Sequence, residues 1–216
     1  MSKRLKQPDE SFDETERAEE YVKEHKRHAA FMYGPFLKDI GKLKVSGRCL
    51  EIGAGAGIFT SLFAGQHPDL HITVTDISPK MIALAGETIR ESLGEEEAKK
   101  RTDFFVCDVN DESALEKLGQ FDLVYSVYSM HHWQNPESAI LHLFKVINEN
   151  GILYLGDLKR VWWLYYLPSK SRDIEQVRAS YAPGEIKKML GRNRISRYEM
   201  QSLFPFFLQS IVVKNQ

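Results

Sequence analysis

Short apolar, β-branched runs alternate with helical patterns from about residue 47 to residue 159. The runs predict five strands, at GRCLEIGAG, LHITVTDIS, TDFFVCDVND, FDLVYSVYSMHHW and NGILYLGDLKR, with four helices between them. Strands that alternate with helices are joined by right-handed crossovers and therefore form a mainly parallel sheet. The nearly continuous apolar character of the strands agrees, because such a sheet is covered on both faces. The alternation thus predicts a doubly wound α/β fold.

Two further strands are predicted after Lys159, where the alternation stops. ISRYEMQSLF and FLQSIVVKN read as strands joined around Phe204-Pro205-Phe206, and we expect them to form an antiparallel pair that closes one edge of the sheet. The prediction is therefore a seven-stranded, mainly parallel sheet with an antiparallel C-terminal strand and helices on both faces. An aromatic run, VWWLYYLP, and a helix at PGEIKKML separate this pair from the fifth strand.

The first 41 residues precede the alternation. Met1 to Asp13 are charged and lack periodicity, which predicts a frayed tail. Glu14 to His28 follow a strongly charged helical pattern that favours a solvated face, and Gly34-Pro35 breaks the segment that follows. We predict an N-terminal tail and helical lid over residues 1–41 and a main domain over residues 42–216.

The charge balance argues against a protein that binds nucleic acid mainly through phosphates. The 29 basic and 30 acidic residues leave a formal net charge of −1, whereas such proteins usually carry a basic excess. KRLK (Lys3 to Lys6) is one local basic patch. Cys49 and Cys107 are too few for a disulfide framework or a thiolate metal site, and no metal is predicted. No signal-peptide pattern or membrane-span-length apolar run is visible, so a cytoplasmic location is expected.

A glycine-rich turn follows the first predicted strand. CLEIGAGAGIF reads G-x-G-x-G at Gly53, Gly55 and Gly57, and Ile58 occupies the third glycine position of the dinucleotide fingerprint G-x-G-x-x-G. Ligands of open α/β sheets bind beyond the carboxyl ends of the strands, so this turn is expected to face the ligand. Gly53 and Gly55 would bring backbone against it, and Gly57 would let the next helix pack near the sheet.

Three carboxylates end three of the predicted strands. Asp76 ends the second strand, where an acidic residue commonly binds the two ribose hydroxyls of an adenosine. Asp108 ends the third strand, where a carboxylate can accept a hydrogen bond from the adenine amine. Glu51 ends the first strand, where it favours a cationic group on the ligand and repels a pyrophosphate. Together the three acids predict an adenosine ligand that bears positive charge.

The ordered motifs of the alternating region resemble those of the class I S-adenosylmethionine-dependent methyltransferases, in particular their small-molecule branch. The motifs are CLEIGAGAGIFT, VTDISPKMIALA, FFVCDVND, FDLVYSVYSMHHW and NENGILYLGDL. The similarity covers about Lys44 to Leu158 and implies a Rossmann-like fold, S-adenosylmethionine as cofactor and a small-molecule substrate. It also implies two more antiparallel strands after the fifth. Glu51 stands where many members carry Asp, and it keeps the charge.

This resemblance also implies roles for individual residues. Glu51 would hold the amino group of the cofactor, Asp76 its ribose and Asp108 its adenine edge. Gly53 and Gly55 would pack against the methionine part. Ile77 and Met81 would lie against the adenine, and Ser126 would lie beside the methionine part. The full set of predicted cofactor-binding residues is Tyr33, Glu51, Gly53, Ala54, Gly55, Asp76, Ile77, Met81, Cys107, Asp108, Val109 and Ser126.

Methyl transfer from a sulfonium is an in-line displacement, which an enzyme promotes mainly by positioning the reactants and excluding water. A base is needed only where the accepting atom holds a proton at neutral pH. His131 and His132 follow the fourth strand at the mouth of the predicted cleft, and either is a candidate catalytic base, with His131 slightly favoured. Alternatively, HHW orients the loop or packs beneath the cofactor.

Aromatic residues supply a candidate cover for the substrate. Trp162, Trp163, Tyr165 and Tyr166 directly follow the fifth strand, and a cover segment is predicted at about residues 160–182. Core packing or a dimer contact is the alternative for this cluster, so the chain is expected to be a monomer or a homodimer. Tyr21 and Tyr33 are candidates for the N-terminal lid.

Two other functions compete with a methyltransferase. A nicotinamide-dependent dehydrogenase has the same architecture, but Ile58 and Glu51 argue against a pyrophosphate at the turn. A non-catalytic adenosyl-binding or partner-binding module would keep the pocket, and the two histidines with the aromatic run argue against an empty substrate half. YSMH stands where an N-P-P-Y-type motif would mark amino-group methylation, which disfavours a planar nitrogen acceptor.

Overall fold

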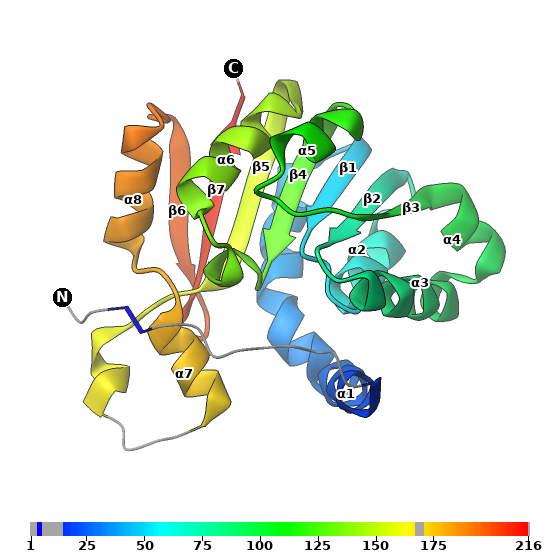
Figure 1. The fold of residues 1–216 in the computed structure, drawn as a ribbon, viewed down its shortest axis with the longest axis horizontal. Helices are drawn as coiled ribbons and strands as arrows, with labels where there is room; N and C mark the ends of the chain where they lie inside the picture. The colour runs from blue at the N-terminus through cyan, green and yellow to red at the C-terminus, as the bar shows by residue number, and fades with distance from the viewer. Residues whose placement is uncertain (1–3, 6–14, 167–170, 216) are drawn as a thin grey trace.

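The computed structural model describes residues 4–5, 15–166 and 171–215. Within these ranges, seven strands form one sheet in the order β3-β2-β1-β4-β5-β7-β6 (Figure 1). They are β1 (Gly47–Ile52), β2 (Leu70–Asp76), β3 (Thr102–Val106), β4 (Phe121–Val127), β5 (Ile147–Leu158), β6 (Tyr198–Leu203) and β7 (Leu208–Lys214). Strands β1 to β5 are parallel. The predicted seven-stranded sheet is confirmed, and its order reverses between β1 and β4.

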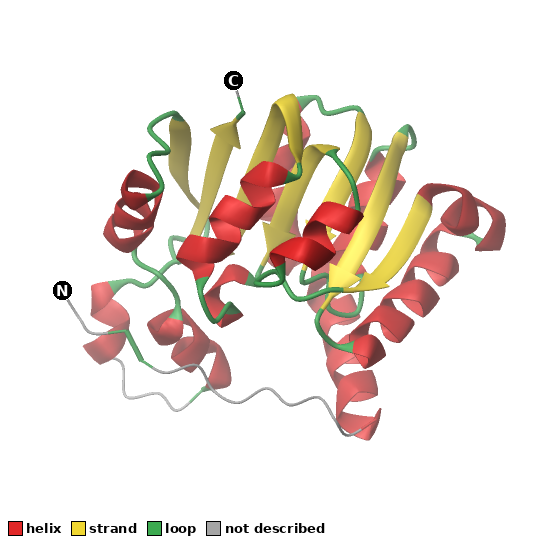
Figure 2. Ribbon diagram, turned by 45° about the horizontal axis from the view of Figure 1, so that its top comes forward, coloured by secondary structure: helices red, strands yellow, loops and turns green. Residues whose placement is uncertain are grey.

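Helices cover both faces of this sheet (Figures 1 and 2). One face carries α1 (Thr15–Ile40), α2 (Ile58–Gln66), α3 (Pro79–Leu93) and α4 (Glu95–Arg101), and the other carries α5 (Glu112–Lys117), α6 (Pro136–Lys145) and α8 (Pro183–Arg192). α7 (Arg172–Ala179) lies at the end toward which the parallel strands point. Three short 3₁₀ helices are η1 (Gly41–Leu43), η2 (Met130–His132) and η3 (Trp162–Tyr166). No helix among the described residues is long and apolar enough to cross a membrane.

Alternate residues of the central strands belong to two separate hydrophobic cores. Cys49 and Tyr125 pack with α1, α2 and α3, whereas Leu50 and Val124 pack with α5, α6 and α8. Successive side chains of a strand point to opposite faces, so one apolar strand contributes to both cores. This two-sided burial is the reason that the strands read as nearly continuous apolar runs.

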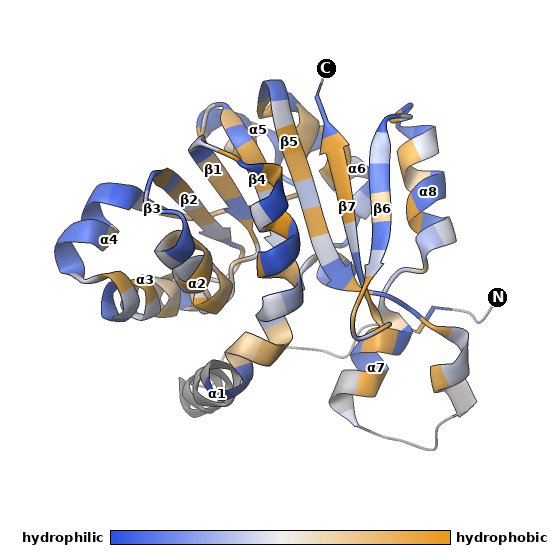
Figure 3. Ribbon diagram, turned by 180° about the vertical axis from the view of Figure 1, so that it is seen from behind, coloured by the Kyte–Doolittle hydropathy of each residue, from blue (hydrophilic) through white to orange (hydrophobic). Residues whose placement is uncertain are grey.

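The two strands after the fifth form the expected antiparallel pair, and β7 is the one described strand that runs against the direction of the others. β7 is antiparallel to both β5 and β6, so β6 runs in the same direction as β5. β7 is buried over six of its seven residues, while every residue of β6 is either half-buried or exposed. The more hydrophobic strand therefore takes the interior position and the more polar one the edge (Figure 3).

The expected break at Gly34-Pro35 is wrong, because α1 runs without interruption from Thr15 to Ile40 with Pro35 inside it. A proline within a helix removes one backbone hydrogen bond and strains the preceding turn. Here the C-terminal half of α1 is held by tertiary contacts: Phe36 and Ile40 are buried in the core. The Tyr128 hydroxyl also donates to the carbonyl oxygen of Met32 at 3.0 Å. Packing thus outweighs the local cost of the proline.

The third strand is shorter than predicted, and α4 before it was not predicted. β3 ends at Val106 instead of Asp111, because its partner β2 ends at Asp76, which is paired with Val106. β3 is an edge strand, and Val106 is 54% exposed, so the expectation of burial on both faces does not hold there. Cys107 and Asp108 therefore lie in the loop that follows the strand.

Two residues of the expected frayed tail are docked on the domain. The backbone N–H of Leu5 donates to the carbonyl oxygen of Arg178, and the Arg4 side chain contacts the end of α7 and η2. Arg4 is thus part of the packed structure and does not belong to a solvated basic patch. The other residues of the predicted tail lie outside the described residues.

Candidate active site

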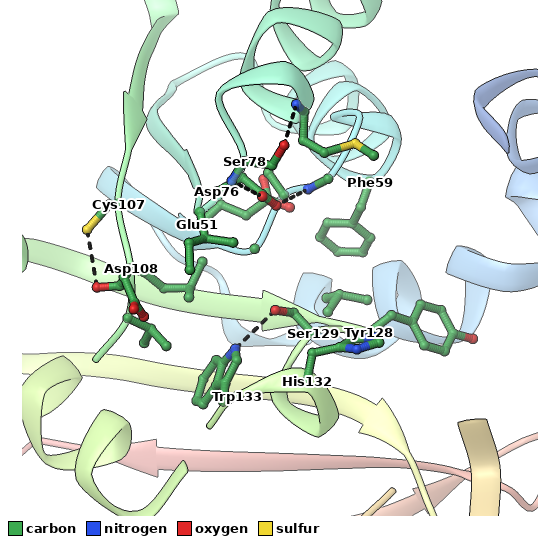
Figure 4. A pocket seen from close by; sticks show the side chains of 18 of the residues that line it. Glu51, Phe59, Asp76, Ser78, Cys107, Asp108, Tyr128, Ser129, His132 and Trp133 are labelled. Carbon is green, nitrogen blue, oxygen red and sulfur yellow. Dashed lines mark hydrogen bonds between the residues drawn. The ribbon is translucent and has the colours of Figure 1, made fainter. Parts of the chain in front are cut away.

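A cavity of about 430 Å³ opens at the carboxyl end of the sheet, where the strand order reverses. The turn after β1, the start of α3, the loop after β3 and the segment after β4 line it (Figure 4). The predicted site residues that it brings together are Tyr33, Glu51, Gly53, Ala54, Gly55, Asp76, Ile77, Met81, Cys107, Asp108, Val109 and His132. Ser126 and His131 are not among its lining residues.

The glycine turn places backbone at the cavity wall. Gly55 has a φ of +53°, and a Cβ added there would meet no atom within 4 Å, so its backbone faces open space. A Cβ on Gly53 would lie 2.0 Å from the Ser129 hydroxyl oxygen, which excludes any larger residue. Gly57 has a different role, since a Cβ there would lie 2.9 Å from the Cα of Ala85. The third glycine thus allows α3, rather than the sheet, to approach the turn.

Glu51 is buried at the end of β1, with 2% of its surface exposed. The hydroxyls of Thr60 and Tyr125 both donate to its Oε2, at 2.5 and 2.9 Å. Burial raises the pKa of the Glu51 carboxyl to about 7, although these two hydrogen bonds lower it and the nearby Asp76 raises it further. A cation placed in the cavity beside Glu51 would favour its ionised form. The site therefore couples cation binding to loss of one proton.

Asp76 closes β2 and organises both the glycine turn and the start of α3. Its Oδ2 accepts from the backbone N–H of Gly55 at 2.8 Å, and its Oδ1 accepts from that of Ser78 at 2.9 Å. Burial raises the pKa of Asp76, and the backbone hydrogen bonds oppose that effect. Each carboxylate oxygen has a second acceptor site, so Asp76 can also accept from two ligand hydroxyls. Ser78 caps α3 by accepting from the Met81 N–H at 3.3 Å.

The loop after β3 forms another wall of the cavity. Asp108 Oδ1 accepts from the backbone and side-chain nitrogens of Asn110, at 2.9 and 3.0 Å. Cys107 and Val109 are buried on either side of it. Ile77, which lines the cavity from the neighbouring loop after β2, is 62% exposed. These side chains surround one carboxylate with apolar surface, which suits a flat ligand with a polar edge.

The structure separates the two histidines. His131 is buried, with its Nδ1 only 2.5 Å from Oδ1 of the buried Asp157 at the end of β5. It does not line the cavity, so this geometry does not support the slight preference for His131 as the base. His132 is exposed and lines the cavity, with its ring centroid 4.1 Å from that of His131. The buried His131–Asp157 pair therefore lies next to the imidazole that faces the ligand space.

Ser126 does not reach the cavity either. Its side chain is 1% exposed and its hydroxyl donates to the carbonyl oxygen of Ile52 at 2.9 Å, which ties β4 to β1. The pleat of β4 turns the next residue, Val127, to the opposite face, and Val127, Tyr128 and Ser129 line the cavity instead. The predicted segment therefore lines the cavity, but Ser126 itself does not.

Several lining residues were missed because they come from segments that read as ordinary core. Tyr128 follows β4 with a φ of +57°, an uncommon conformation for a residue with a side chain. Its ring lies 5.8 Å from that of Tyr33, which also contacts Phe59 at the same centroid distance. Trp133 donates from Nε1 to the Ser129 hydroxyl at 3.0 Å. In the sequence, these residues are marked only by their position in or near HHW and the glycine turn.

The predicted aromatic cover does not line this cavity. Trp162 and Trp163 are 69% and 42% exposed and line a separate cavity of about 370 Å³, together with Lys159, Arg160 and Pro183 among others. The side chains of Tyr21, Tyr165 and Tyr166 lie outside the described residues. Among the described residues of 160–182, none lines the cavity that holds the three carboxylates.

The sequence of the chain is similar to those of known methyltransferases. A family model described as a methyltransferase domain matches residues 50–153. The malonyl-[acyl-carrier protein] O-methyltransferase of Paenibacillus sp. (strain JDR-2) is 32% identical over 106 residues, which cover 49% of this chain and 37% of that protein. The juvenile hormone acid O-methyltransferase of Bombyx mori is 25% identical over 181 residues, covering 76% and 62%. The chain thus spans less than two thirds of the length of either relative.

Solved structures of low sequence identity have the same fold. An O-methyltransferase family protein from Burkholderia thailandensis has a TM-score of 0.74 at 15% identity, covering 94% of this chain and 60% of that one. A SAM dependent methyltransferase from Aquifex aeolicus has a TM-score of 0.72 at 14% identity, covering 92% and 98%. The plantazolicin methyltransferase BpumL, solved in complex with SAH, has a TM-score of 0.70 at 17% identity, covering 95% and 91%. In its matching domain model, its relatives and its strand order, the chain is similar to the class I S-adenosylmethionine-dependent methyltransferases.

Proposed function

We propose that this protein transfers a methyl group from S-adenosylmethionine to a small molecule. The observation that carries the proposal is the convergence of Glu51, Asp76 and Asp108, from the ends of three neighbouring strands, on the cavity that His132 also lines. The described lining residues include no Lys or Arg. An acidic cavity of this kind suits a cationic adenosyl compound and disfavours a pyrophosphate, which argues against a nicotinamide cofactor.

The residues present fit this cofactor. The buried Glu51 has a raised pKa and gains from a neighbouring ammonium, which the methionine part would supply. Asp76 has remaining acceptor sites for the two ribose hydroxyls. Asp108 with Cys107 and Val109 would contact the adenine, and the open space at Gly55 would admit the ligand close to the backbone.

When bound, the cofactor supplies a sulfonium-activated methyl carbon for in-line displacement. The protein residues orient the two reactants and exclude water, which is the main source of rate acceleration in such a transfer. His132 lines the cavity and would accept the proton of an acceptor that is protonated at neutral pH. His131 would orient the loop from below through its bond to Asp157. Tyr33 would close the cavity from α1, as part of an N-terminal lid over residues 1–41.

The names of the relatives describe which groups those proteins methylate. The names of two curated relatives specify O-methylation, of a malonyl group on an acyl carrier protein and of juvenile hormone acid. A structural neighbour, CurJ, is described as a carbon methyltransferase, with a TM-score of 0.59. We propose a small-molecule acceptor without assigning its accepting atom, a monomer or homodimer, and no nucleic-acid partner. The two cysteines are free and buried, which agrees with a cytoplasmic location.

The experiment that tests the proposal is calorimetric titration of the pure protein with S-adenosylmethionine and S-adenosylhomocysteine, followed by an acceptor screen with methyl-labelled cofactor. Micromolar binding and labelling of at least one compound are expected. Absence of binding to both adenosyl compounds, or tight binding of a nicotinamide dinucleotide instead, would overturn the proposal. Binding with no labelling across metabolite pools would favour a non-catalytic adenosyl-binding module.

A further inference from the structure

Arg4 joins two segments that are far from it in the sequence. Its Nε donates to the carbonyl oxygen of Ala179 at 2.6 Å, and its Nη2 donates to the carbonyl oxygen of His131 at 2.8 Å. The guanidinium carbon lies 4.1 Å from the ring centroid of Tyr181. One side chain thus contacts η2 on one side and the end of α7 on the other.

The surface that receives Arg4 is formed by buried residues that are tied to the sheet. Ala179 and Ser180 are fully buried, and Tyr181 is 6% exposed. The carbonyl oxygen of Tyr181 accepts from the Gln209 side chain at 2.9 Å, which anchors this segment to β7. Arg4 therefore binds against a platform that the sheet itself holds in place.

The chemistry of the two accepting carbonyls explains why a guanidinium fits there. Ala179 is the last residue of α7, so its carbonyl has no partner within the helix, and a cation at this end interacts favourably with the helix dipole. Arginine offers donors on several nitrogens in one plane and can stack on an aromatic ring at the same time. A lysine could supply the charge, but it could not make both hydrogen bonds and the stacking contact together.

The hydrogen bond from Arg4 to the carbonyl oxygen of His131 connects Arg4 to the candidate active site. His131 belongs to η2, and the next residue of this three-residue helix, His132, lines the cavity. We propose that Arg4 is a positioning residue of the active site: it holds the backbone of η2 against the end of α7 and so fixes where His132 faces the ligand. Arg4 does not line the cavity itself. This role rests on the proposed methyl transfer.

The first test needs no methyl acceptor and uses the ligand-free full chain. Amide hydrogen exchange is compared between the wild type, Arg4→Ala, Arg4→Lys and Leu5→Ala, which keeps the guanidinium and truncates an exposed neighbour. The His132 N–H, which donates to Ser129, and the Ser180 N–H, which donates to Val177, are the reporters. In Arg4→Ala both are expected to exchange at least about tenfold faster, as loss of a charged hydrogen bond implies. Arg4→Lys should be intermediate and Leu5→Ala unchanged.

The second test separates positioning from general stability. The three carboxylates are not contacted by Arg4, so Arg4→Ala should bind S-adenosylhomocysteine within about twofold of the wild type. With a labelled acceptor, its kcat should fall while KM for the cofactor stays constant, and millimolar guanidinium should restore part of the lost rate.

Exchange of the His132 amide at the wild-type rate in Arg4→Ala would overturn the inference, as would loss of exchange protection spread evenly over the sheet. If the wild type fails to bind the adenosyl compound, the proposed function fails, but the exchange comparison still decides whether Arg4 holds η2.

Discussion

Ionisation of Glu51 should make binding of the adenosyl cofactor depend on pH. The carboxyl is buried, and its pKa is raised to about 7, so near neutral pH it is half protonated in the free protein. A ligand ammonium beside it favours the carboxylate, so binding below this pH requires release of one proton. If the complex keeps Glu51 ionised, Kd should rise about tenfold for each pH unit below about 7. Affinity at about pH 5.5 should then be about thirtyfold weaker than at about pH 8.

The assay is isothermal titration with S-adenosylhomocysteine across this interval, in buffers of different ionisation enthalpy. Close to one proton should be released per site at the acidic end, falling toward zero at the alkaline end. The matched variant is Glu51→Gln, which keeps the shape but has no proton to lose, so its weak binding should be independent of pH. Asp76→Asn and His132→Ala are measured alongside, because burial also raises the pKa of Asp76 and His132 lines the same cavity.

The reasoning is refuted if wild-type affinity is flat between these two pH values, or if Glu51→Gln keeps the slope and another variant loses it.

The Glu51 carboxyl also links the stability of the fold to pH. Its pKa is higher in the folded protein, about 7 against an ordinary 4.5, so the folded state binds more protons between these values. Its contribution to the free energy of unfolding is therefore fully present below about pH 4.5 and falls by about 3 kcal/mol as the pH rises through 7. Urea unfolding of wild type and Glu51→Gln at both ends of the interval measures this difference.

Three further predictions test separate parts of the site. Asp76→Ala should weaken binding of S-adenosylhomocysteine at least about tenfold in calorimetry, because charged hydrogen bonds to the ligand are lost; unchanged affinity would contradict the ribose role. Gly57→Ala should cost about 1–3 kcal/mol in urea unfolding through the clash with Ala85. Gly55→Ala, also at positive φ but facing open space, should cost clearly less, and equal losses would exclude the clash. His132→Ala should lower the methyl-transfer rate about 10²-fold or more, with cofactor affinity within about twofold.

Much of the fold followed from the pattern of the sequence, and the exceptions have identifiable causes. Helix α3 begins where Ser78 and Pro79 predict it, because capping is a property of adjacent residues. Helix α1 continues through Pro35, because burial of Phe36 and Ile40 compensates for the local cost. The predicted end of β3 is too late, because β3 ends where its partner β2 ends, and β2 is distant in the sequence.

Some features of the candidate site also followed from the sequence, whereas others depended on the tertiary structure. Glu51, Asp76 and Asp108 were each predicted at the end of a strand, so the topology of a doubly wound sheet brings them together, and all three line the cavity. His131 and His132 are adjacent and chemically identical, so no pattern could rank them; the buried Asp157 at the end of β5 holds the first and leaves the second to face the cavity.

By itself, the sequence determined the α/β alternation, the resemblance to methyltransferases and the acids at the strand ends, because each depends on local periodicity or on motifs next to strand ends. Only the tertiary structure decided that the interior place in the sheet belongs to β7, that Tyr128 and Ser129 rather than Ser126 line the cavity, and that Arg4 contacts η2. These depend on which surfaces meet across the chain, and the free energy of such contacts is set by burial and hydrogen bonding between residues that are distant in the sequence.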